Sequence, residues 1–468
     1  MPSGLQKILG QTAIYGLSSV VARVLNYFLV PLYTRLLLPE AYGVVSEFYA
    51  YIAIFAVILS HGMETAFFRF GEKSPSAKGT AFRSITFFAI LLCGSAFIFP
   101  QEIATLIDRG EFSHLIYLSA IILILDSLAI IPLSELRLTG KPIPFASARL
   151  IGIVVNLSLN IYWFVGVGWI DITAIFWANI AGSAATLIFV FARGGWKGLL
   201  VWDNSLWQKM GKYAWPIAIA GLAYVINEAI DRILLRYLLP ADTADYMVGI
   251  YSACYKLSIL MSLCVQAYRM GVEPYFFNSS DAAKEQNLKR LMYLFSWFGG
   301  GLFMAICSQM FWLKGFIGEN YHEGLFVVPI LVFANGMLGV YFNLSYWYKS
   351  TDKTYYGALF SVFGALITLA INIALIPTLG YLASAWATLL CYLGMTVLSA
   401  WQGHKKSPVH YNWFRIGFYW LVPVLVYFCF QSFFNTTLTS LFVSLPFGVL
   451  WFLLGYKTEI KKKATTTP

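Results

Sequence analysis

Charged residues are scarce in this chain. Of its 468 residues, 12% are Asp, Glu, Lys or Arg, whereas 59% are hydrophobic. A soluble domain carries about 25% charged residues, so the composition excludes a soluble globular protein. Many apolar runs are long enough to cross a bilayer, which takes about 20 residues. They are continuous rather than alternating, which excludes an outer-membrane barrel. The sequence therefore predicts an all-α polytopic membrane protein.

The motifs of enzymes and metal sites are also lacking. There is no P-loop and no H-E-x-x-H motif, the five histidines are scattered, and none of the six cysteines forms a C-x-x-C pair. We therefore expect no catalytic residue, no cofactor and no metal site. No cleavable signal peptide is evident, because the first apolar run, near Gly10, is long and contains Arg23.

The apolar runs predict fourteen spanning helices. Their approximate limits are 12–37, 42–68, 80–99, 115–136, 146–167, 172–192, 213–239, 246–273, 288–311, 325–347, 355–377, 380–401, 414–432 and 436–456. Positive charges gather in the even-numbered connections and the C-terminal tail, whereas the odd-numbered connections carry only Arg109 and Lys314. By the positive-inside rule, both termini are expected to be cytoplasmic, in a cytoplasmic (inner) membrane. The net charge of +10 then reflects topology and not a nucleic-acid partner.

Short motifs recur in the same order in the two halves of the chain. The matched pairs are Arg35–Pro39 with Arg236–Pro240, Lys141 with Lys353, Asn160 with Asn372, Gly168 with Gly380, and Trp177-Ala178 with Trp386-Ala387. Such a repeat predicts two pseudo-symmetric six-helix lobes inserted the same way up, a plan known among transporters. Residues 1–200 would form the first lobe and 201–405 the second, and 406–468 would hold two further helices and a basic tail.

Helix-breaking and aromatic residues have simple interpretations. The run Gly299–Gly301 could provide a bend in a moving transporter, although glycine is common in membrane helices. Aromatic residues make up 18% of the chain. Trp163, Trp169, Trp347 and Tyr348 fit the aromatic belts that form at membrane interfaces.

Eight charged residues stand out within the predicted spans. Each charge near the centre of a membrane helix costs roughly 2.5–3.5 kcal/mol, so such side chains normally face protein or a watery cavity. In the span at 213–239, three of them recur every four residues and share one helix face. The eight residues are Arg23, Arg35, Glu64, Glu228, Asp231, Arg232, Arg236 and Lys256.

Two interpretations of these charges stay open. The basic members could line a cavity between the lobes and bind a phosphate or pyrophosphate, because guanidinium and ammonium groups match phosphate oxygens. These candidate substrate-binding residues are Arg23, Arg35, Arg232, Arg236 and Lys256. Alternatively, the charges pair internally, for example Glu228 with Arg232, and only tie helices together. Glu64, Glu228 and Asp231 are accordingly either ion-coupling groups or partners in such pairs.

These motifs resemble a known family. They are typical of the polysaccharide-transporter branch of the multidrug/oligosaccharidyl-lipid/polysaccharide exporter superfamily, and the similarity extends over about residues 5–460. The family has a Pro-x-x-Gly-x-x-x-Ala-x-x-Ala turn late in the second half. This chain departs from it, because Ser384-Ala385 stands at the small-residue positions of that turn. The segments that carry the resemblance are Arg35 to Gly43, Asp231-Arg232, Gly249 to Ser252, and Pro377 to Ala387.

The resemblance implies two six-helix lobes with two extra helices. It implies a flippase that exports a lipid-linked oligosaccharide, such as an O-antigen unit on a polyprenyl pyrophosphate, by alternating access around the basic cavity. The product would serve lipopolysaccharide or other polysaccharide biosynthesis. Expected partners are that lipid-linked oligosaccharide, membrane lipids and glycan-assembly enzymes. The alternatives are a drug/cation antiporter of the same superfamily, whose cavity should be acidic, and an integral-membrane glycan polymerase or ligase.

Overall fold

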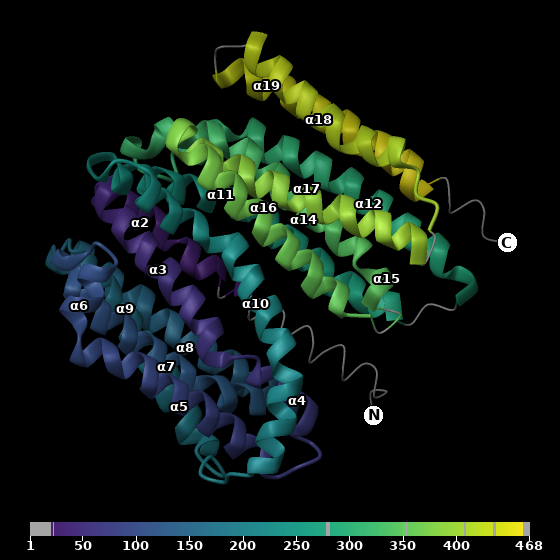
Figure 1. The fold of residues 1–468 in the computed structure, drawn as a ribbon. Coiled ribbons are helices and arrows are strands. Elements are labelled where there is room, and N and C mark those ends of the chain that lie inside the picture. The colour runs from purple at the N-terminus through teal and green to yellow at the C-terminus, as the bar shows by residue number, and fades with distance from the viewer. Residues whose placement is uncertain are drawn as a thin grey trace. The chain divides into compact units, whose positions relative to one another are not determined.

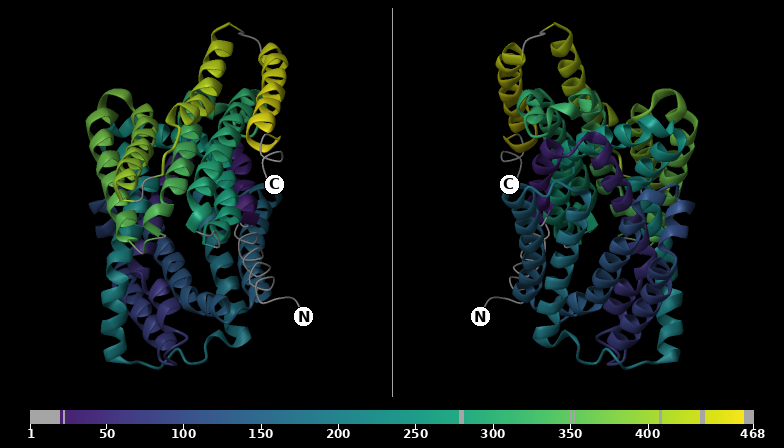
Figure 2. Two further views of the ribbon diagram at one scale, coloured as in Figure 1. Left: turned by 90° about the vertical axis from the view of Figure 1, so that its right-hand side faces the viewer. Right: turned by 90° about the vertical axis from the view of Figure 1, so that its left-hand side faces the viewer.

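Helices account for every regular element that the structure describes (Figure 1; Figure 2). The structure is a computed structural model and describes residues 20–21, 23–277, 281–349, 351, 353–406, 409–433 and 437–461. The predicted all-α fold is confirmed. The chain divides into two compact units, residues 1–236 and 237–468. Lys7, the start of the first predicted span and the end of the basic tail lie outside the described residues.

The first unit is built from nine α-helices and three short helical turns in its described part. They are α2 Leu29–Leu36, α3 Pro39–Ser60, α4 Met63–Phe70, α5 Ala77–Ile98, α6 Pro100–Leu106, η1 Gly110–Phe112, α7 Ser113–Leu138, α8 Pro142–Ile161, η2 Tyr162–Val167, α9 Ile172–Val190, η3 Phe191–Gly195 and α10 Asn204–Leu238.

The second unit follows α10, and α14 is its most deeply buried helix. Its described elements are α11 Ala241–Phe277, α12 Asp281–Ser308, α13 Met310–Lys314, η4 Glu319–Val327, α14 Val328–Leu344, α15 Tyr346–Lys349, α16 Tyr355–Leu379, α17 Tyr381–Lys406, α18 Trp413–Phe433, α19 Thr437–Gly455 and η5 Tyr456–Lys461.

Ten helical segments of the described residues are long and apolar enough to cross a membrane. They match the second to sixth and the eighth to twelfth predicted spans. The helix α10 has 35 residues, a length of about 52 Å, but its charges make it less apolar than these ten. A shorter apolar helix, Trp413–Cys429, lies within α18. The total of fourteen spans stays a prediction.

Proline ends one helix and starts the next in both copies of the repeated Arg-x-Leu-Leu-Pro motif. Proline lacks an N–H group and disfavours helical backbone at the residue before it. Leu38 is accordingly extended, with ψ 155°, and Pro39 opens α3. In the second copy, α10 ends at Leu238 and α11 begins at Ala241, directly after Pro240. The matched sequences therefore produce matched breaks.

Other matched residues have matching surroundings. Trp177 and Trp386 are 41% and 42% exposed, and the alanine that follows each tryptophan is fully buried. Asn160 and Asn372 are fully buried as well. The side chain of Asn160 accepts a hydrogen bond from Tyr33 of α2, which joins two helices of the first unit.

The division between the compact units falls later than the predicted lobe boundary at residue 200. Most of α10 groups with the first unit, because its residues Met210 and Ala214 pack into an apolar core with Met63 of α4 and Ala81 of α5. The helices α18 and α19 belong to the second compact unit. The division into two repeats and a C-terminal part stays a prediction.

The glycine run of α12 serves close packing. The helix continues through Gly299–Gly301 without a break. A Cβ atom on Gly299 would lie 2.7 Å from the Trp420 ring, and one on Gly300 would overlap the backbone carbonyl oxygen of Tyr419. The absent side chains therefore let α18 approach α12.

A left-handed break between α3 and α4 determines where Glu64 lies. His61 has φ 31° and Gly62 has φ 75°, a backbone conformation that glycine adopts without steric cost. A Cβ atom at Gly62 would also lie 2.5 Å from the carbonyl oxygen of Ala214 in α10. Helix α4 restarts at Met63 with Glu64 in its first turn.

The substitution Gly62→Ala should therefore destabilise the protein by about 2–4 kcal/mol, through left-handed strain and overlap with α10. Thermal unfolding of the purified protein in detergent measures the loss. Gly94→Ala is the control, because a Cβ atom there meets nothing within 4 Å. Equal unfolding midpoints for the two variants would contradict this account of the break.

Candidate functional site

The charged face of α10 contains a buried ion pair. The guanidinium of Arg232 donates from Nη1 to Asp231 Oδ1 at 2.7 Å, and it also donates to the backbone carbonyl of Glu228. Asp231 is 2% exposed and Arg232 is 8% exposed. Asp231 and the backbone carbonyl of Glu228 thus compensate the charge of Arg232 inside the unit.

The end of α10 is tied to the loop between α6 and η1. Arg236 is 8% exposed and donates from Nη2 to Asp108 Oδ2 at 3.1 Å. The next loop residue, Arg109, donates from Nε to Glu47 Oε2 of α3 at 2.9 Å. Glu47 is fully buried and Arg109 is 2% exposed. Tyr51 donates to the other Glu47 oxygen at 3.2 Å. Two ion pairs therefore join three segments at one loop.

A second group of charges lies on α4, α7 and α8, together with Arg23, which precedes α2. Ser134 donates to Glu64 Oε1 at 2.9 Å, and Arg137 donates to the same oxygen at 3.3 Å. Arg149 is attracted by the carboxylates of Glu64 and Asp126 and repelled by two arginines. We call this group the Arg149 cluster; its members are Arg23, Glu64, Asp126, Arg137 and Arg149.

Exposure separates the two groups. Arg232 and Arg236 are buried, whereas Arg23, Asp126 and Arg149 are exposed. The side chains of the Glu64–Arg137 pair are 43% and 44% exposed. Exposed arginines on membrane helices face water or protein rather than lipid, because charge is costly in hydrocarbon. In the described part of this unit, the Arg149 cluster is therefore a charged group that a soluble anion can reach.

The structure distributes the predicted site residues over different places. Arg23 joins the Arg149 cluster through its charge, and Glu64 is a member of the same cluster. Arg35 is exposed on α2, and Glu228 is half-buried on α10. Lys256 is half-buried on α11, in the second unit. Its convergence with the arginines of the first unit stays a prediction.

Several charged residues of the site were missed by the sequence analysis. Glu47, Asp126 and Arg149 lie within the predicted spans 42–68, 115–136 and 146–167. Arg23 was singled out because a charge is costly inside a membrane helix, and the same criterion applies to these three residues. Arg109 was counted as a loop charge, and its burial depends on a contact with a residue 62 positions away. Among the described residues, no group of three or more His, Cys, Asp or Glu side chains could hold a metal ion.

A family model described as "Polysaccharide biosynthesis protein" matches residues 32–268. This match covers half of the chain and includes the α10 ion pairs and most of the Arg149 cluster. The chain belongs to this polysaccharide biosynthesis family. A protein of the Lsg locus of Haemophilus influenzae is 20% identical over 364 residues, which are 70% of this chain and 84% of that protein.

Solved structures of transporters share the fold of this family member. The lipid II flippase MurJ, in an inward closed conformation, has a TM-score of 0.69 at 14% identity, over 95% of this chain and 99% of that chain. An inward-facing multidrug resistance MATE family transporter of the MOP superfamily has a TM-score of 0.57 at 12% identity, over 90% and 96% of the two chains. At 12–14% identity, these similarities show that the chain shares the fold of these transporters.

Burial should decide how much each ion pair contributes to stability. Glu47→Gln should lower the free energy of unfolding by about 3–5 kcal/mol, because Arg109 would keep a buried charge without the Glu47 carboxylate. Glu64→Gln affects an exposed pair and should cost less than about 1 kcal/mol. Thermal unfolding in detergent compares the two variants. A similar loss in both would mean that the difference in burial has no energetic consequence.

Proposed function

We propose that this protein is a flippase that moves a lipid-linked oligosaccharide across the cytoplasmic membrane for cell-surface polysaccharide biosynthesis. The observation that carries the proposal is the Arg149 cluster, a solvent-reachable group of three arginines and two carboxylates on helices of a polysaccharide biosynthesis family member. A fold shared with a lipid II flippase supports a lipid-linked cargo.

The charge of the cluster suits a phosphate or pyrophosphate group. Guanidinium groups bind phosphate oxygens through two parallel hydrogen bonds. Three arginines against two carboxylates leave one net positive charge, so an anionic ligand is attracted and a cationic drug is disfavoured. The carboxylates of Glu64 and Asp126 also limit the affinity, since a transported ligand must leave again.

The position of the cluster suits loading from the cytoplasmic side. Arg137 is in the last turn of α7, next to a connection that the positive-inside rule predicts to be cytoplasmic. Arg149 lies two turns inside α8, and Asp126 lies three turns before Arg137 on α7. The cluster thus extends from the predicted cytoplasmic end of the helices toward their middle.

The arginines of α10 have a different role in this proposal. The cargo would have to displace Asp231 from Arg232 or Asp108 from Arg236, and both guanidiniums are buried. We assign Arg232 and Arg236 to holding α10 in place, and Arg23 to contact with the cargo phosphate. Ion coupling at Asp231 would require the carboxylate to release its bound arginine.

Arg149→Gln should reduce export at least tenfold, because it removes a charge-assisted contact of about 1.5–3 kcal/mol. The measurements are surface polysaccharide in a complemented deletion strain and lipid-linked oligosaccharide retained on the inner leaflet. Arg193→Gln is the matched control. Arg193 is exposed and lies 5.2 Å from the ring of Phe189, four residues earlier, as Arg149 lies 5.7 Å from the ring of Phe145.

The membrane content and the thermal unfolding of both variants must match those of the parent protein. Normal export with Arg149→Gln would overturn the role of the cluster. Efflux of a cationic dye that depends on this protein, without any effect on surface polysaccharide, would instead support a drug/cation antiporter.

A further inference from the structure

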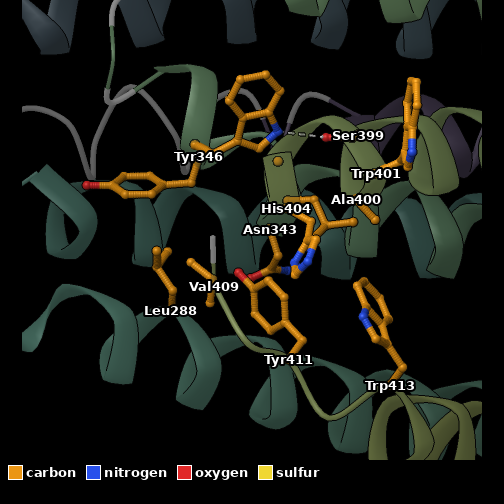
Figure 3. A pocket seen from close by; sticks show the side chains of 13 residues that line it. Leu288, Asn343, Tyr346, Ser399, Ala400, Trp401, His404, Val409, Tyr411 and Trp413 are labelled. Atoms are coloured by element: carbon orange, nitrogen blue, oxygen red, sulfur yellow. Dashed lines mark hydrogen bonds between the residues drawn. The ribbon is translucent and has the colours of Figure 1, made fainter. Parts of the chain in front are cut away.

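The second unit contains a pocket whose lining includes five tyrosine and tryptophan side chains (Figure 3). Its volume is about 250 Å³. It forms where the ends of α14 and α17 meet α15, the start of α12 and the segment before α18. The residues used below are Asn343, Tyr346, Trp347, Trp401, Tyr411 and Trp413.

The floor of the pocket is buried and its polar groups already have protein partners. Asn343 is 4% exposed and Trp347 is 5% exposed. The side-chain oxygen of Asn343 accepts a hydrogen bond from Tyr268 at 2.7 Å, and the indole N–H of Trp347 donates to Ser399 at 3.3 Å. Trp347 therefore belongs to the interior rather than to an exposed aromatic belt. A ligand meets mainly ring faces on this floor.

The mouth of the pocket is open and aromatic. Trp401 is 52% exposed and Trp413 is 48% exposed, and Figure 3 shows both rings on the same side of the pocket. Tyr411 also lines the pocket, and burial raises the pKa of its phenol. This group therefore stays protonated at neutral pH and can donate a hydrogen bond to a ligand oxygen.

The rim of the pocket is basic. The last turn of α17 carries Lys405 and Lys406, and the Lys405 ammonium lies 3.7 Å from the centre of the Trp401 ring. The neighbouring carboxylate of Glu285 contacts Lys289 at 2.8 Å and His410 at 3.4 Å. Lys405 thus provides positive charge directly beside the aromatic mouth, and Lys406 follows it at the end of α17.

The location of the pocket points to a lipid. The helix ends around it lead into three connections that the positive-inside rule predicts to be cytoplasmic. Tryptophan is enriched at membrane interfaces, and the cytoplasmic leaflet carries anionic lipids that attract clustered lysines. A pocket of about 250 Å³ is below the roughly 300–1,000 Å³ of sites for drug-sized ligands, so it is too small for an oligosaccharide.

We propose that this pocket binds an anionic phospholipid of the cytoplasmic leaflet. The phosphodiester lies against Lys405 and Lys406, and the glycerol and the first part of one acyl chain lie between Trp401 and Trp413. The rest of the lipid stays in the bilayer. This proposal depends on the predicted orientation of the helices and not on the identity of the cargo.

Native mass spectrometry of the full-length protein in a non-ionic detergent tests the proposal, with phosphatidylglycerol and phosphatidylcholine as probes. The parent should bind one phosphatidylglycerol more tightly than phosphatidylcholine. Lys405→Gln combined with Lys406→Gln should weaken phosphatidylglycerol binding about 30-fold, since each interfacial lysine contributes about fivefold. Ala400→Phe should abolish the tight binding, because Ala400 lines the pocket and a phenyl ring there would fill it.

The control is Lys209→Gln combined with Lys212→Gln. Both lysines are exposed on α10, near a predicted cytoplasmic connection but in the other unit, and this variant should bind phosphatidylglycerol as the parent does. Equal binding of the two lipids would overturn the proposal, as would unchanged binding in the Lys405/Lys406 variant, whose substitutions are at exposed positions and spare the core. Competition by soluble glycerol phosphate would identify an anion site without a lipid. The export activity of the Arg149→Gln variant tests the proposed function and has no bearing on whether this pocket binds a lipid.

Discussion

A guanidinium group inside an apolar helix needs either a carboxylate or water, because burying its charge without either costs several kcal/mol. The first unit uses both solutions. Arg109 and Arg232 are buried against Glu47 and Asp231, whereas Arg149 stays exposed between opposing charges. A buried pair adds little net stability but allows few alternative arrangements, since separating it is costly. The buried pairs therefore fix the helices, and the exposed cluster keeps a charge that a ligand can neutralise.

This distribution of charge depends on where the helices break. Asp108 has φ 55° and lies between α6 and η1, so that Asp108 and Arg109 reach two different helices from adjacent positions. Likewise, the left-handed pair before α4 redirects a long span and places Glu64 beside Ser134 of α7. A straight helix could present charges only along one stripe. The breaks thus bring charges that are distant in the sequence into contact with one another.

The sequence predicted the helices better than the contacts of the charges. Long apolar runs and X-Pro steps determine where helices lie and end, so ten predicted spans match described helices. The pairing of Arg236 with Asp108 depends on residues 128 positions apart, and periodicity within one helix contains no information about it. The spacing of four suggested Glu228 as a partner of Arg232, and the structure places Arg232 against the backbone carbonyl of Glu228 and the side chain of Asp231, a neighbour that the spacing of four does not single out.

The two units share motifs but differ in the chemistry of their interiors. Among the described residues of the second unit, Glu459 is the one buried charged side chain, whereas the first unit buries five. In the second unit, buried neutral amides join helices instead of ion pairs. Asn335 donates to Ser258, and Asn372 accepts from Ser384. A buried amide joins helices at a far smaller desolvation cost than an ion. A repeat therefore predicts equivalent backbone breaks but not equivalent charge, and this is why the anion site is assigned from the contacts of the first unit and not by symmetry.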